Sequence, residues 1–164
     1  MVKGGIEAWC DSEHGVDDAR RLLDNFSNLY FKVKGVSGQY WVSGGGERRI
    51  TSPPMVTKMC EYEHPDVILS HDGEPFFSIE ITNATPKSGG NAVQRLPRAV
   101  KAAELGIPSI ELGPWISNPT PATARGVKAR LIIMEFHKVP CLNILFKHNN
   151  NESFEKQLHF LKRR

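Results

Sequence analysis

Residues 64–82 constrain the fold more than any other part of this chain, because their pattern predicts two strands joined by a tight turn. Asp72 and Gly73 form the turn signal between the two apolar runs. Asp66 opens the first strand, and Glu80 lies near the end of the second. A carboxylate is rarely buried in a core strand without a partner, so each of these acids requires a reason.

The register of the hairpin decides whether the two carboxylates meet. Directly opposed residues of an antiparallel pair point to the same face of the sheet. A two-residue turn places Asp66 opposite Ile79, which sends Glu80 to the other face. A three-residue turn that includes Glu74, or a bulge in one strand, places Asp66 opposite Glu80. The paired arrangement therefore requires an odd loop or a bulge, and the alternative is a surface hairpin with two unrelated acids.

Two carboxylates held side by side provide the oxygen ligands that Mg²⁺ prefers. The hairpin therefore predicts a Mg²⁺ or Mn²⁺ site formed by Asp66 and Glu80. Metal-dependent cleavage of a phosphodiester bond is the chemistry that such a site favours.

The segments Pro65-Asp66 and Glu80-Ile81-Thr82 resemble the two halves of the signature of the PD-(D/E)XK nucleases, a family that includes most type II restriction endonucleases. The resemblance implies an α/β fold with a restriction-endonuclease-like αβββαβ core, in which helices flank a mixed sheet. It also implies that the two acids bind Mg²⁺, with the backbone carbonyl of Ile81 as a further ligand.

The chain departs from the family at Thr82, which stands where a lysine assists the attacking water. Because side chains alternate along a strand, Thr82 shares a face with Glu80 and is expected to point into the site. A threonine supplies no positive charge there. Lys87, five residues further on, is the candidate that reaches back from the following loop.

Residues 91–106 are predicted to form a helix, because apolar residues recur there at helical spacing. Asn91 is the expected N-cap and Gly106 the expected stop. Pro97 is expected to bend this helix or to mark a later start. Residues 108–112 follow as a buried strand, so the resemblance covers roughly residues 60–113 of the chain.

A polar stripe runs along this helix through Gln94, Arg98 and Lys101, with Arg95 beside it. The resemblance implies that Gln94 faces the site, where either Lys87 or Gln94 would orient the water. It also implies that Arg95, Arg98 and Lys101 contact nucleic acid, with Arg95 at the scissile phosphate. The alternative is an amphipathic helix whose basic stripe is merely solvated.

Amphipathic and apolar patterns predict the remaining elements of the chain. We expect helices over 16–26, over 52–62 with Ser52 as N-cap, and over 152–161; strands over 29–35, 39–43, 129–136 and 141–146; and a loop over 115–125. The predicted architecture is one α/β domain over residues 1–164, with a mixed sheet of about five to seven strands. Its size also fits the catalytic part of a larger protein.

The net charge of +3 is only mildly basic, so contact with nucleic acid depends on local patches. Such patches are predicted at 47–49, 95–101, 125–130 and 162–164. The three cysteines lack metal-ligand spacing and predict reduced thiols in a cytoplasmic protein. No apolar run is long enough to span a membrane, and the start of the chain does not resemble a signal peptide.

The residues and the resemblance together predict a Mg²⁺-dependent endonuclease acting on double-stranded DNA, working as a homodimer or in a larger nuclease assembly. Two alternatives remain: a non-catalytic nucleic-acid-binding module on the same fold, and an RNA endonuclease. Some members of the family use a further acid from the first helix as a metal ligand. The candidates for it are Glu7, Glu13, Glu47 and Glu61, and no spacing selects among them.

Overall fold

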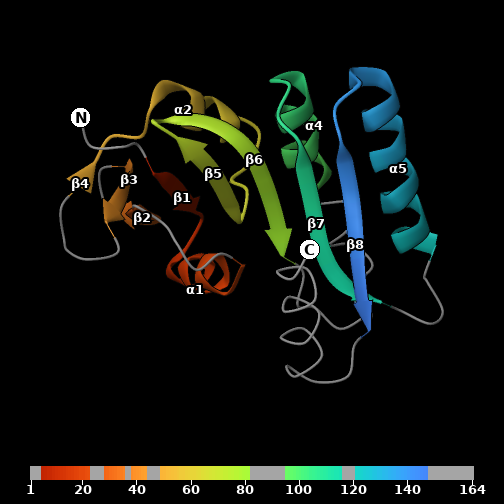
Figure 1. Cartoon of the computed structure of the whole chain (residues 1–164), viewed down its shortest axis with the longest axis horizontal. Helices are drawn as coiled ribbons and strands as arrows, with labels where there is room; N and C mark the ends of the chain where they lie inside the picture. Colours follow the sequence, from red (N-terminus) through yellow and green to blue (C-terminus); the bar gives the residue numbers. More distant parts are fainter. Residues whose placement is uncertain are drawn as a thin grey trace.

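The computed structural model describes residues 5–22, 28–35, 38–43, 49–81, 95–115 and 121–147. Helices and strands follow one another along the chain (Figure 1) as β1 (Ile6–Cys10), α1 (Glu13–Leu22), β2 (Asn28–Gly35), β3 (Gly38–Ser43), β4 (Arg49–Ile50), α2 (Pro54–Met59), β5 (Val67–His71), β6 (Glu74–Ile81), α4 (Leu96–Glu104), β7 (Ser109–Trp115), α5 (Pro121–His137) and β8 (Cys141–Lys147). In this part of the chain, no helix is both long and apolar enough to cross a membrane.

The strands form one sheet in the order β4-β3-β2-β1-β5-β6-β7-β8. Pairing is antiparallel at β1–β5 and β5–β6, and parallel at β6–β7 and β7–β8. The predicted α/β class, a mixed sheet flanked by helices, is therefore confirmed. The described residues give eight strands rather than five to seven, because β1 and the short β4 pair as strands that the sequence pattern did not reveal.

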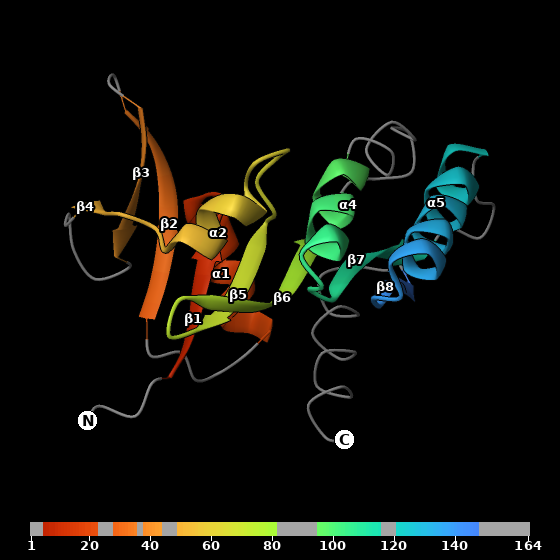
Figure 2. The ribbon, with the colours of Figure 1, turned by 90° about the horizontal axis from the view of Figure 1, so that it is seen from above.

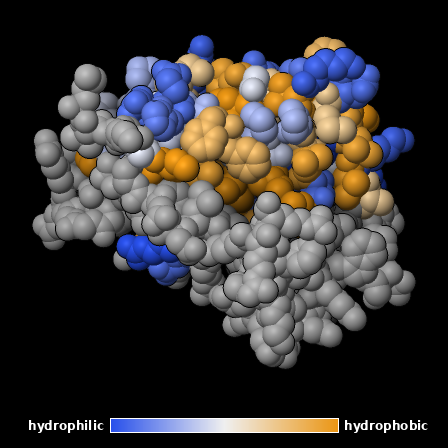
Figure 3. All heavy atoms as spheres, in the orientation of Figure 1, coloured by the Kyte–Doolittle hydropathy of each residue, from blue (hydrophilic) through white to orange (hydrophobic). Residues whose placement is uncertain are grey.

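Helices cover both faces of the sheet (Figure 2). On one face, Val16 and Ala19 of α1 pack on apolar residues of β1, β5, β6 and β7. Apolar side chains also gather over the middle of this face in the space-filling view (Figure 3). On the other face, α2 packs over Trp9 and Ile68, and α4 packs against α5 through small residues such as Ala99. This second face carries the polar residues of interest.

A two-residue turn joins β5 to β6, with Asp72 and Gly73 both at positive φ (51° and 80°) and His71 paired with Glu74. Such a turn alone would place Asp66 opposite Ile79. A bulge corrects the register, because Ser70 pairs with Pro75 while Leu69 pairs with Phe77.

The extra residue in this bulge is Phe76, which is left without a partner on β5. Beyond the bulge, Val67 pairs with Ile79, so Asp66 precedes β5 at the level of Glu80. The structure thus contains the bulge that the paired arrangement required.

The helix after the hairpin begins later than residue 91. Arg95 is the N-cap of α4, Pro97 lies in its first turn, and Gly106 (φ 73°) follows its end. The later start at Pro97 and the stop at Gly106 are confirmed, because proline fits the first turn and glycine adopts the left-handed conformation after the last. The predicted N-cap, Asn91, lies outside the described residues.

The prediction of a strand over 129–136, preceded by a loop over 115–125, is wrong. Strand β7 extends to Trp115, and residues 121–137 form the helix α5. An apolar run of this length does not by itself distinguish a strand from a helix segment. In the helix, Ile133 packs against α4, whereas Phe136 is 81% exposed.

Two smaller predictions also differ from the structure. Helix α2 is capped by Pro53 rather than Ser52, whose hydroxyl instead contacts that of Thr57. The first helix begins at Glu13 rather than at residue 16. The predicted closing helix over 152–161 lies outside the described residues.

Candidate functional site

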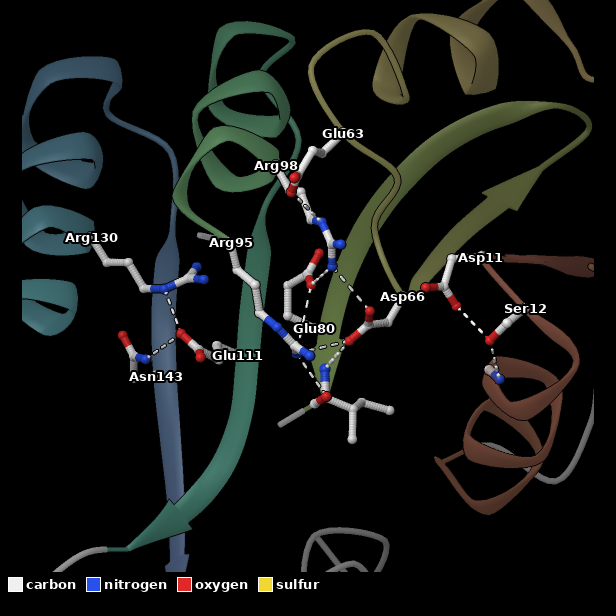
Figure 4. A network of polar contacts seen from close by, with 12 residues as sticks. Asp11, Ser12, Glu63, Asp66, Glu80, Arg95, Arg98, Glu111, Arg130 and Asn143 are labelled. Atoms are coloured by element: carbon white, nitrogen blue, oxygen red, sulfur yellow. Dashed lines mark hydrogen bonds and ion pairs between the residues drawn. The ribbon is translucent and has the colours of Figure 1, made fainter. Parts of the chain in front are cut away.

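A row of polar side chains crosses the strands β6, β7 and β8 on the face covered by α4 and α5 (Figure 4). Glu80, Glu111 and Asn143 are paired in register across these strands, and Asp66 continues the row beside Glu80. Buried acids require compensation, because an unpaired charge away from water is costly. Arginines from α4 and α5 supply it, in two separate clusters.

The first cluster, which we call the Asp66 cluster, consists of Asp66, Glu80, Arg95, Arg98 and the carbonyl of Ile81. The Nη1 atom of Arg98 donates to Asp66 Oδ1 at 3.0 Å and to Glu80 Oε2 at 2.6 Å. One guanidinium nitrogen therefore bridges both carboxylates. The prediction that they converge on one face is confirmed.

Arg95 lies on the other side of Asp66. Its Nη1 atom is 3.0 Å from Asp66 Oδ2, 2.7 Å from the carbonyl oxygen of Ile81 and 3.9 Å from Glu80 Oε2. The amide of Ile81 also donates to Asp66 Oδ2 at 2.6 Å, which fixes the carboxylate against the end of β6. The three groups predicted as metal ligands thus surround a single positively charged nitrogen.

Glu80 is the least solvated member of the cluster, with only 1% of its surface exposed. Burial, and secondarily the charge of Asp66, raise its pKa to about 8 from an ordinary value of 4.5, although Arg98 and Arg95 oppose the rise. Its second oxygen, Oε1, is buried and has no hydrogen-bond partner in the described structure. A buried acceptor of this kind indicates a position suited to a further donor or cation.

Asp11 is an acid near the site that the sequence analysis did not single out. It follows β1, and its backbone amide donates to the Asp66 carbonyl at 3.1 Å. Burial raises the pKa of Asp11, the Ser12 hydroxyl lowers it, and Asp66 raises it further. In the sequence, the feature that could have identified Asp11 is its position directly after a short apolar run.

Of the acids proposed earlier as a further ligand, the described structure places the side chains of Glu7 and Glu61, and both are paired elsewhere. Glu7 instead accepts hydrogen bonds from Ser70 and Gly73, and Glu61 pairs with Lys101. For residues 13 and 47, the described structure places no side chain.

The second cluster, which we call the Glu111 cluster, lies under α5. Arg130 Nε donates to Glu111 Oε2 at 2.9 Å, and Asn143 Nδ2 donates to the same oxygen at 2.9 Å. Arg130 also approaches the buried sulfur of Cys141, at 3.5 Å. Its Nη2 atom is buried without a hydrogen-bond partner in the described structure. The prediction that residues 125–130 form an exposed basic patch is wrong at Arg130, which is 1% exposed.

Ion pairs within the protein occupy two of the residues that were predicted to contact nucleic acid, Arg98 and Lys101. Arg98 binds Glu63 in addition to the two site acids, and Lys101 is buried on α4, where it pairs with Glu61 and Glu104. At Arg98 and Lys101 the stripe is therefore not a solvated basic face, and contact of these residues with nucleic acid stays a prediction.

Three predicted site residues, Thr82, Lys87 and Gln94, lie outside the described residues. The cysteines Cys10, Cys60 and Cys141 form no disulfide, as predicted.

The donor set of the Asp66 cluster fits a hard divalent cation. Two carboxylates and a backbone carbonyl are oxygen ligands of the kind that Mg²⁺ uses together with water. The described residues contain no group of three or more His, Cys, Asp or Glu side chains suited to a metal, so Asp66 and Glu80 would act with the Ile81 carbonyl. Glu80 Oε1, which has no hydrogen-bond partner in the described structure, is a further oxygen ligand for such a cation.

Comparisons with protein-family models, curated proteins and solved structures found nothing similar to this chain. The class of the protein therefore rests on its fold, an α/β mixed sheet, and on the geometry of the Asp66 cluster.

Proposed function

We propose that this protein is a Mg²⁺- or Mn²⁺-dependent endonuclease that hydrolyses phosphodiester bonds of double-stranded DNA, on a restriction-endonuclease-like fold. One observation carries the proposal: Asp66, Glu80 and the Ile81 carbonyl surround one cationic nitrogen at the end of a bulged hairpin. A hairpin followed by α4 and a parallel strand β7 also matches the order implied by the family resemblance.

The residues of the site have separate roles in this proposal. Asp66, Glu80 and the Ile81 carbonyl hold the ion, which when bound acidifies a water and neutralises charge on the phosphate. Arg98 keeps the two carboxylates at a fixed separation through its bridging Nη1. We assign the water to Lys87, in place of the lysine of the family signature, or to Gln94, and the phosphate to Arg95.

A second candidate function, a non-catalytic nucleic-acid-binding module, is favoured by the charge balance of the site. Arg95 and Arg98 already neutralise Asp66 and Glu80, and Thr82 replaces the lysine of the family signature. A cluster of this kind is stable without a metal. The two candidates differ in whether phosphodiester cleavage occurs.

Plasmid cleavage with Mg²⁺, with Mn²⁺ and with chelator tests the proposal. We expect cleavage only with metal, and a loss of at least about 100-fold in Asp66→Ala, because removing one preorganised charge costs about that much. Asp17→Ala is the matched control, because Asp17 is a surface acid on α1 that pairs with Arg20 one turn away.

Cleavage that persists in chelator, or that survives in Asp66→Ala, would contradict the proposal. Binding of DNA without cleavage by any variant would favour the module. A single-stranded RNA substrate in the same assay distinguishes the RNA endonuclease alternative.

The missing lysine gives a gain-of-function test. Thr82→Lys should raise the cleavage rate by about 10-fold or more, because it restores a positive charge beside the attacking water. Lys87→Ala should lower the rate only if Lys87 serves that role. An unchanged rate in Thr82→Lys would show that residue 82 does not face the water.

A further inference from the structure

We infer that Arg95 is an exchangeable cation of the Asp66 cluster. Its guanidinium holds the ligand set in the metal-free protein and leaves when a metal enters, and it then becomes available to a phosphate of the nucleic acid. This inference rests on the proposed function and extends it, because it makes metal binding and phosphate binding two steps that share one side chain.

The position of the guanidinium carries the inference. Arg95 Nη1 lies within 3.0 Å of both Asp66 Oδ2 and the Ile81 carbonyl oxygen, and 3.9 Å from Glu80 Oε2. A metal that binds these three groups must occupy the space that this nitrogen fills. Two positive charges do not share such a position, because both compete for the same oxygens and repel each other.

Arg95 is better placed to leave than Arg98. Arg95 is the N-cap of α4 and lies before its first turn, and 22% of its side chain is exposed. Arg98 lies within the helix and is held by three acids, Glu63 among them. A metal can therefore displace Arg95 more readily than Arg98.

Titration calorimetry with Mn²⁺ and with Mg²⁺ alone tests the exchange. We expect Arg95→Ala to bind the metal at least about tenfold more tightly than the wild type, because no guanidinium must be displaced. Arg20→Ala is the matched control, because it removes an exposed arginine that pairs with the neighbouring Asp17, away from the Asp66 cluster. Arg95→Gln should also bind the metal more tightly than the wild type. This second variant keeps the test decisive if Arg95→Ala fails to fold.

The outcomes separate this inference from the proposed function. Equal affinity in the wild type and in both Arg95 variants overturns the exchange and leaves the metal site intact. Binding by the Arg95 variants that exceeds that of the wild type, and that an added Asp66→Ala removes, supports both. No binding by any variant overturns the metal site and the exchange together.

Duplex DNA binding tests the second step. The dependence of affinity on salt should be measured by fluorescence anisotropy with Ca²⁺ and with chelator. Each phosphate contact adds about 0.9 to the slope of log K against log salt. With Ca²⁺, the slope of the wild type should exceed that of Arg95→Ala by about this amount, whereas with chelator the two slopes should agree. The same difference under both conditions would overturn the release of Arg95 by the metal.

Discussion

The two polar clusters on the helix-covered face of the sheet are built from the same chemistry and differ in access to solvent. In each, a carboxylate on the sheet is paired with an arginine from the helix above it, Glu80 with Arg98 in the first and Glu111 with Arg130 in the second (Figure 4). In the Glu111 cluster, the side chains of Arg130 and Glu111 are 1% and 8% exposed. In the Asp66 cluster, those of Arg95 and Asp66 are 22% and 14% exposed.

The position along the strands explains this difference. Glu111 lies in the middle of β7 beneath the 17-residue helix α5, so its ion pair is sealed. Glu80 is the next-to-last residue of β6, and the strand ends at Ile81, whose carbonyl accepts from Arg95 instead. The comparison teaches that an acid–arginine pair is structural where packing encloses it and exchangeable where a strand end opens it.

The largest expected effect is on the stability of the protein when the enclosed ion pair of the Glu111 cluster is broken. Arg130→Met should lower the free energy of unfolding by about 3–5 kcal/mol, because it leaves the carboxylate of Glu111 buried without its charged partner. Arg95→Met should cost only about 1–2 kcal/mol, because Arg95 is partly exposed and Arg98 still holds Asp66. Urea denaturation of both variants measures the difference.

A double variant sharpens this contrast. Replacing Glu111 by Leu together with Arg130→Met removes the stranded charge, so it should recover much of the lost stability. Equal losses of stability in Arg130→Met and Arg95→Met would show that the exposure of the two clusters to solvent does not decide how much each arginine stabilises the fold.

The next largest effect concerns how the stability of the protein depends on pH through Glu80 of the Asp66 cluster. The pKa of Glu80 is about 8 in the folded protein, above its ordinary value of 4.5, so the folded state binds more protons between these pH values. The free energy that protonated Glu80 contributes to folding is therefore lost as the pH rises through this window, by at most about 1.4 kcal/mol for each pH unit.

Glu80→Gln removes this titration. Measured in chelator from pH 5 to pH 8.5, the stability of the Gln variant relative to the wild type should increase with pH. A difference that stays constant, or that reverses, would show that Glu80 is not held protonated by its burial.

The smallest expected effect concerns the support of Asp66 by α1. A Cβ atom added at Gly15 would lie 2.9 Å from the backbone oxygen of Asp66 and 3.0 Å from Cβ of Cys10. Gly15→Ala should therefore destabilise the protein by about 1 kcal/mol through overpacking. It should also weaken metal binding, whereas the Glu111 cluster, which lies under α5 on the opposite face of the sheet from α1, should be unaffected.

Thermal denaturation and calorimetry with Mn²⁺ measure the two effects of Gly15→Ala. Undiminished stability would show that α1 shifts to accommodate the methyl group. Weakened stability with unchanged metal affinity would show that the Asp66 carboxylate keeps its position without support from α1.

Local sequence determined the hairpin, its two acids and the end of the following helix. Asp72 and Gly73 specify the turn, and Gly106 ends α4 because the left-handed conformation there suits glycine. The need for a bulge also followed from the sequence, since side chains alternate along a strand and Asp66 and Glu80 meet only in one register. These features depend on residues close together in the chain.

Tertiary structure alone decided the rest. The bulge at Phe76, the helical state of residues 121–137 and the approach of Asp11 to Asp66 depend on packing between distant segments. The same is true of Arg95, whose guanidinium lies between the Asp66 carboxylate and the Ile81 carbonyl because the start of α4 lies beside the end of β6. Periodicity fixes the face on which a side chain lies, but the partner that neutralises a buried charge is chosen by the whole fold, because desolvation is compensated only by groups brought together in space.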